Sequence, residues 1–90
     1  MKKVEINIDS VIKILFDNYD NKIRAHNNMD TFYSEEYYEG ACEVLLDLLS
    51  NILCKEELEK IENHLVVIEA KVKTEVVKNI YDANNYRVHR

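Results

Sequence analysis

The sequence predicts an all-α protein, a three-helix antiparallel bundle preceded by a short N-terminal strand or arm. Its 90 residues contain one glycine and no proline, which leaves few of the residues that turns between strands require. Apolar residues recur at steps of three and four along most of the chain, the spacing of amphipathic helices. The length fits one domain over residues 1–90 with a modest core. We expect helices at about residues 10–27, 31–53 and 55–82.

The N-terminal segment is expected to be extended before the first helix begins. Residues 4–8, Val-Glu-Ile-Asn-Ile, alternate apolar and polar side chains, as a short strand or arm does. Asp9 or Ser10 then offers an N-cap for the first helix. The Asn27-Asn28 pair is its expected end. One apolar face is predicted for this helix: Ile12, Leu15, Phe16, Tyr19, Ile23 and His26.

The second helix has the clearest apolar pattern in the chain. Asp30, Thr31 and Ser34 are alternative N-caps, and the helix is expected to run to about residue 53. Side chains spaced by three and four form its predicted packing seam: Tyr38, Ala41, Leu45, Leu48 and Ile52.

The third helix is expected to start directly after Cys54, because the segment from Cys54 to Glu57 has the layout of a capping box with cysteine in the serine position. The helix is predicted to end before Asn84-Asn85 and to extend past the other two. Its core face is predicted to contain Leu58, Ile61, Leu65, Ile68, Val72, Val76 and Ile80.

An α+β alternative is also open. Residues 65–73 alternate with period two and are rich in β-branched side chains, so they could form a strand paired with residues 4–8. We favour the helix, because no turn residue separates this run from the helical pattern before it.

Charge and composition limit the classes of function. The net charge is −5, yet residues 30–53 hold six acids and no base. An acidic patch without a lysine or arginine cluster argues against direct nucleic-acid binding. It favours, as the binding partner, a larger protein with a basic surface. The sequence has two cysteines, Cys42 and Cys54, and does not begin with an apolar segment like that of a signal peptide. We therefore expect a cytoplasmic protein with reduced thiols. No apolar run approaches the ~18 residues that a membrane span needs.

Four carboxylates are expected on one exposed face of the second helix: Glu36, Glu39, Glu43 and Asp47. Three interpretations stay open for this acidic row, namely a solvated face, a partner-binding face and a Mg²⁺ or Ca²⁺ site. Glu35, Glu36 and Glu39 also resemble the first half of the metal motif of all-α nucleotide pyrophosphohydrolases. The second Glu-x-x-Asp of that family is absent, so no catalytic residue, metal ligand or cofactor is predicted.

Tyr33, Tyr37 and Gly40 line the border between the predicted core face and the acidic row. This border could be covered by the first helix, by a second copy or by a foreign partner. A further apolar stripe is predicted on a flank of the third helix, at Val66, Ala70, Val77 and Tyr81. The stripe predicts a homodimer, unless the N-terminal arm folds back over it.

The segments VEINIDSVIKIL and YYEGACEVLLDLL, with their polar link, resemble small helical-hairpin proteins of unknown function from phages and mobile elements of low-GC Gram-positive bacteria. The resemblance covers residues 4–53. It implies an accessory protein in the host cytoplasm that acts by binding, as acidic anti-defence and anti-CRISPR inhibitors do. The function we expect is therefore non-catalytic inhibition of a host defence protein, such as a CRISPR effector, through the acidic face.

Two other functions stay open. One is an oligomeric sponge for a small nucleotide signal, which would use Tyr33 and Tyr37 together with bases such as Lys22, Arg24 or Lys55. The other is the metal-dependent pyrophosphohydrolase.

Overall fold

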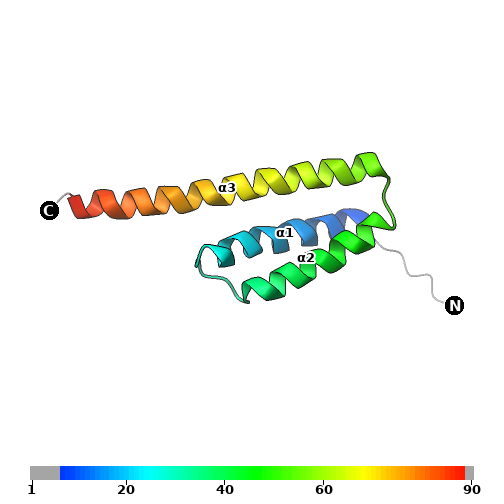
Figure 1. Cartoon of the computed structure of the whole chain (residues 1–90), viewed down its shortest axis with the longest axis horizontal. Coiled ribbons are helices and arrows are strands. Elements are labelled where there is room, and N and C mark those ends of the chain that lie inside the picture. Colours follow the sequence, from blue (N-terminus) through cyan, green and yellow to red (C-terminus); the bar gives the residue numbers. More distant parts are fainter. Residues whose placement is uncertain (1–6, 89–90) are drawn as a thin grey trace.

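The computed structural model describes residues 7–88, with side chains through residue 80. Three helices follow one another: α1 (Ile8–His26), α2 (Glu35–Ser50) and α3 (Lys55–Val88). Consecutive helices run in opposite directions, so α1 and α3 point the same way (Figure 1). The all-α three-helix bundle is confirmed, and no strand lies within residues 7–88.

The first helix begins earlier than its sequence predicts. Asn7 is the N-cap, and its side-chain Oδ1 accepts a hydrogen bond from the Ser10 N–H at 3.2 Å. The predicted caps Asp9 and Ser10 are therefore wrong. Starting the helix here places Ile8 against the hydrophobic core. Residue 8 is helical rather than part of an arm, and residues 4–6 lie outside the described residues.

The link from α1 to α2 includes residues 31–34, which were expected to form the start of the second helix. Asn28 adopts the left-handed conformation, with φ 59°, which asparagine tolerates better than most residues. Ser34 is the N-cap of α2, and its side chain accepts a hydrogen bond from the Tyr37 N–H. The Tyr38 hydroxyl accepts another from the Tyr33 N–H at 3.2 Å, which holds Tyr33 in the loop. At its other end, α2 stops at Ser50 rather than residue 53.

α3 is a single helix from Lys55 to Val88. The favoured helix over residues 65–73 is confirmed and the alternative strand is wrong. Ile61, Leu65 and Val72 are buried at helical spacing on the side facing α1. Cys54 directly precedes the helix, as expected, and its thiol donates to Glu57 Oε1 at 3.2 Å. This contact joins two side chains, whereas a capping box joins side chains to backbone N–H groups. Asn84-Asn85 does not end the helix, which continues six residues past the expected position.

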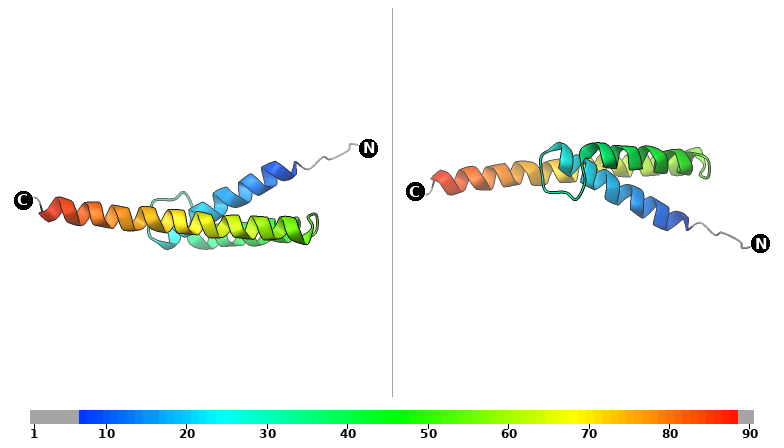
Figure 2. Two further views of the ribbon diagram at one scale, coloured as in Figure 1. Left: turned by 90° about the horizontal axis from the view of Figure 1, so that it is seen from above. Right: turned by 90° about the horizontal axis from the view of Figure 1, so that it is seen from below.

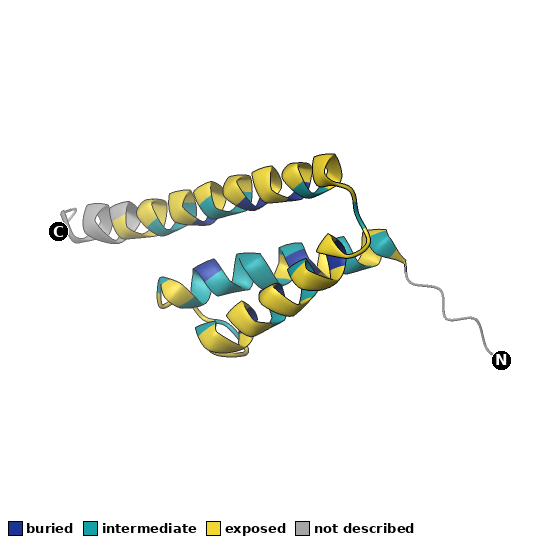
Figure 3. Ribbon diagram, turned by 45° about the vertical axis from the view of Figure 1, so that its right-hand side comes forward, coloured by how far each residue is buried: buried dark blue, intermediate teal, exposed yellow. Residues whose placement is uncertain are grey.

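The core lies where α1 meets both other helices. α1 makes extensive contacts with α2 and α3, whereas α2 and α3 touch each other little. Figure 2 shows α1 crossing α3 at an angle. The buried cluster draws on all three helices: Leu15, Cys42, Leu49, Ile61 and Leu65. Most of the outward surface of α2 and α3 is exposed (Figure 3).

Two side chains of the predicted α2 seam are not covered. Leu48 is 37% exposed and Ile52 is 41% exposed, while Leu49 is fully buried. The reason is that α2 packs mainly against one neighbour, α1, so its buried arc is narrower than its apolar arc. His26, expected on the apolar face of α1, is also exposed.

Polar contacts attach the middle of α3 to α1. Arg24 forms ion pairs with Asp20 on its own helix and with Glu75 on α3, the latter at 2.8 Å. Hydrogen bonds to Glu75 and Asp20 raise the pKa of Arg24 above its usual value. The Tyr19 hydroxyl donates to Glu69 Oε2 at 3.3 Å. Beyond Glu75, α3 continues past the end of the α1–α2 hairpin, so the predicted overhang is present (Figure 1).

Candidate functional site

The acidic row lies on the exposed face of α2, as predicted. Glu36, Glu39, Glu43 and Asp47 are all exposed. Among the side chains of residues 7–80, none forms an ion pair or hydrogen bond with these four carboxylates. The nearest acidic neighbour that does have a partner is Glu35, which lies 2.9 Å from His26 Nδ1. The acidic row therefore presents all four carboxylates to the solvent.

An open groove runs beside the acidic row, between α1 and α2, with a volume of about 600 Å³. Ile14 and Asn18 line it from α1, and Glu36 belongs both to the groove and to the acidic row. The α2 lining is completed by Tyr37, Gly40, Ala41, Val44 and Leu45. Three of the apolar lining side chains are unusually accessible: Ile14 is 49%, Tyr37 53% and Val44 68% exposed. The groove is apolar along its floor and acidic along one rim.

Gly40 lies in this groove with free space above it. A Cβ atom built at Gly40 would meet no heavy atom within 4 Å. One of the three alternatives for this border was that Gly40 accommodates the first helix of the same chain. This alternative is wrong, because α1 does not approach Gly40 closely enough to require a glycine. A glycine inside a helix costs about 1 kcal/mol relative to alanine. No close packing contact at Gly40 within the described residues offsets this loss of helix stability.

The aromatic cluster at the start of α2 divides into a structural and an exposed part. Tyr38 is buried, with 5% exposure, and belongs to the core as predicted. Tyr33 and Tyr37 stack on each other, with ring centroids 4.2 Å apart and planes inclined by 26°. Both stay more than half exposed, and Phe32 beside them is 95% exposed. The exposed aromatic edge continues the groove towards the α1–α2 loop.

The carboxylates considered for a metal site do not converge. Glu35 is paired with His26 instead, with Oε2 2.9 Å from His26 Nδ1. Within the described part of the chain, no group of three or more His, Cys, Asp or Glu side chains is arranged to hold a metal ion.

The residues considered for a nucleotide site are also separated. Arg24 is held by Asp20 and Glu75 on the side of α1 that faces α3. The Lys22 ammonium lies over the Tyr19 ring, 5.7 Å from its centroid. Lys55 begins α3, at the end of the bundle opposite to Tyr33 and Tyr37 (Figure 1). The two tyrosines instead belong to residues 30–53, which hold six acids and no base, and this negative charge repels phosphate.

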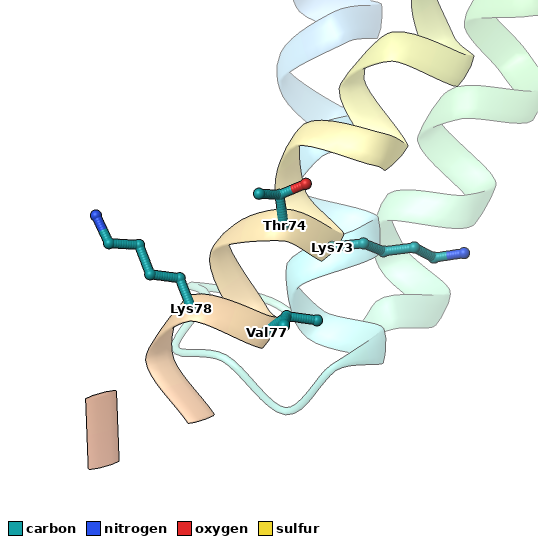
Figure 4. Close-up of a pocket in the computed structure, with 4 residues that line it drawn as sticks. All are labelled: Lys73, Thr74, Val77 and Lys78. Atoms are coloured by element: carbon teal, nitrogen blue, oxygen red, sulfur yellow. The ribbon is translucent and has the colours of Figure 1, made fainter. Parts of the chain in front are cut away.

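The apolar stripe on α3 is exposed over its described part. Val66 is 65% and Val77 is 66% exposed, Ala70 is exposed between them, and the side chain of Tyr81 lies outside the described residues. Lys73 interrupts the stripe and pairs with Glu69 at 2.8 Å. An open hollow of about 580 Å³ lies at Lys73, Thr74, Val77 and Lys78. Figure 4 shows Lys73 and Val77 on one side of the helix and Lys78 on the other.

Sequence analysis missed the contribution of α1 to the groove. Ile14 lies off the apolar face of α1, one residue before the fully buried Leu15. The sequence did contain a signal for this contribution, because Ile14 is apolar but lies outside the predicted core face of the first helix. Phe32 was missed as an exposed loop residue because it was expected inside the second helix.

The two cysteines differ in environment. Cys42 is buried in the core cluster, and desolvation raises the pKa of its thiol. Cys54 is exposed at the start of α3. Both are free, and neither lies in the groove.

Comparisons of the chain with protein-family models, with curated proteins and with solved structures give no match. None of the helices in the described residues is both long and apolar enough to cross a membrane.

Proposed function

We propose that the protein is a non-catalytic binding protein that occupies a basic surface of a larger protein with the acidic row of α2. One observation carries the proposal. Four exposed carboxylates without partners in the described chain lie beside an accessible apolar groove, in a segment with no base between residues 30 and 53.

The charge pattern fits capture of a basic partner. Rows of like charge raise the association rate with an oppositely charged surface and disfavour partners of the same sign. The neighbouring apolar side chains supply contact area that keeps the partner bound after the encounter. On the resemblance to phage and mobile-element proteins, we propose a nucleic-acid-binding defence protein in the host cytoplasm, such as a CRISPR effector, as the first partner to test.

Reversing two charges of the acidic row, with Glu39→Lys and Glu43→Lys, is expected to lower the association rate with the partner about tenfold and to weaken its salt dependence. The partner is first isolated on the tagged protein from native cells and then purified. The rate constants are measured by surface plasmon resonance at two salt concentrations.

The control is Glu59→Lys with Glu62→Lys, two exposed positions on α3 that change the net charge equally. This variant is expected to bind like the native protein. If both double variants lose the same amount of binding, total charge rather than the acidic row governs capture. Equal binding of native protein and the α2 variant would remove the proposal.

A homodimer through α3 is a separate proposal, supported by the exposed Val66 and Val77. Light scattering on a sizing column is expected to give twice the mass of one chain, and Val77→Lys is expected to give a monomer. Val67→Lys serves as the control, since Val67 is 58% exposed but lies outside the stripe. A native monomer at all concentrations tested contradicts this proposal.

A further inference from the structure

The groove and the acidic row share one helix and one side chain. Glu36 lines the groove and opens the acidic row, so a molecule seated in the groove lies next to the carboxylates. The exposed side chains along this side of α2 extend from Glu36 to Leu48, about 18 Å along the helix axis. This length corresponds to about 12 residues of a docked helix.

We infer that the groove receives one amphipathic helix of the partner, with its apolar side chains between Ile14 and Val44 and its lysines or arginines over the acidic row. The inference rests on the proposed function, since it names the part of the basic partner that is recognised. An apolar groove between two antiparallel helices accepts a third helix by the packing used within bundles.

Gly40 allows the backbone of a bound helix to lie close to α2. Its missing side chain leaves an opening on the floor between Tyr37 and Val44, where another backbone can approach α2. The stacked Tyr33 and Tyr37 offer large, rigid rings with polar tips at one end of the groove.

Charge argues against a second copy in the groove. Two copies meeting on this face would bring two α2 helices together, each with the acidic row and without a base in residues 30–53. An occupant with lysine or arginine on one flank removes that repulsion, and an apolar seam on the same helix fills the groove.

The test uses Gly40→Leu, which fills the groove with a side chain of high helix propensity. This variant is expected to melt at a temperature at least as high as the native protein, because leucine replaces glycine inside a helix in open space. It is expected to bind the purified partner about tenfold more weakly by isothermal titration. Asn63→Leu, an exposed addition of the same side chain on α3, is expected to leave binding unchanged.

A synthetic peptide probes the occupant directly. Its 18 residues carry leucine at helical spacing on one face and lysine on one flank, and a second peptide carries glutamate in place of lysine. The lysine peptide is expected to bind the native protein, to lose about tenfold affinity for Gly40→Leu, and to exceed the glutamate peptide about tenfold.

The outcomes separate this inference from the proposed function. Partner binding that is lost in the Glu39→Lys and Glu43→Lys variant but kept in Gly40→Leu overturns the helix-in-groove inference and leaves the proposed function standing. If partner binding is unchanged in both variants, the helix-in-groove inference and the proposed function are both overturned. A native dimer that Gly40→Leu dissociates, while Val77→Lys does not, assigns the groove to a second copy and overturns the inference.

Discussion

Replacing Leu15 with alanine is expected to lower the free energy of unfolding by about 2–5 kcal/mol, as truncation of a buried leucine does. Leu15 is fully buried on α1, the helix that packs against both others. Within residues 7–80, eight hydrophobic side chains are buried, so this core is small and a single cavity removes a large share of the stability. Urea unfolding followed by circular dichroism measures the effect.

The adjacent residue provides the control. Ile14 is 49% exposed and lines the groove, so Ile14→Ala is expected to change stability by less than about 1 kcal/mol. Equal losses for the two variants contradict the orientation of α1, because that orientation alone distinguishes neighbouring apolar residues.

Replacing Tyr38 with alanine is expected to lower the free energy of unfolding by about 3–5 kcal/mol, the usual cost of truncating a buried aromatic side chain. Tyr38 is 5% exposed, and its hydroxyl also holds the backbone of Tyr33. Tyr38→Phe keeps the ring and removes this one hydrogen bond, with an expected cost of about 1 kcal/mol. Chemical unfolding of the two variants separates ring packing from the hydrogen bond.

Tyr37→Ala gives the opposite profile. Tyr37 is 53% exposed in the groove, so its truncation is expected to cost less than about 1 kcal/mol of stability and to weaken partner binding. A large loss of stability in Tyr37→Ala, with binding retained, would mean that the two tyrosines exchange these roles.

The helix number and most of the core faces follow from periodicity alone. Leu58, Ile61, Leu65 and Val72 share one face of α3 whatever the tertiary structure, so their contact with the bundle is predictable. The strand alternative arose because β-branched residues at 65–73 also satisfy period two. The buried side chains of this region are spaced by four and seven residues, which is the spacing of a helix and excludes a strand.

Helix ends and the width of the buried arc depend on information that is not local. Asn7, Asp9 and Ser10 are all competent caps, and the packing of Ile8 on the core favours the first of them. Leu48 and Leu49 are both leucines on the apolar arc. Only the position of α1 determines that Leu49 is buried and Leu48 is not.

The candidate site was predictable in part. Spacing places Glu36, Glu39, Glu43 and Asp47 on one exposed face, and it places Gly40 beside them. The groove itself needed the structure, because its second wall comes from Ile14 and Asn18 on another helix. The empty space above Gly40 likewise depends on the distance between α1 and α2.

The most direct test of the binding surface is a nuclear magnetic resonance titration of the ¹⁵N-labelled protein with the purified partner. Gly40 is the only glycine in the chain, so its amide signal reports on the groove without ambiguity of residue type. The amides of Tyr37, Gly40 and Val44 are expected to shift in proportion to bound partner, while those of Val66 and Val77 stay in place. Shifts confined to α3, with an unmoved Gly40 signal, would contradict binding through the groove and the acidic row.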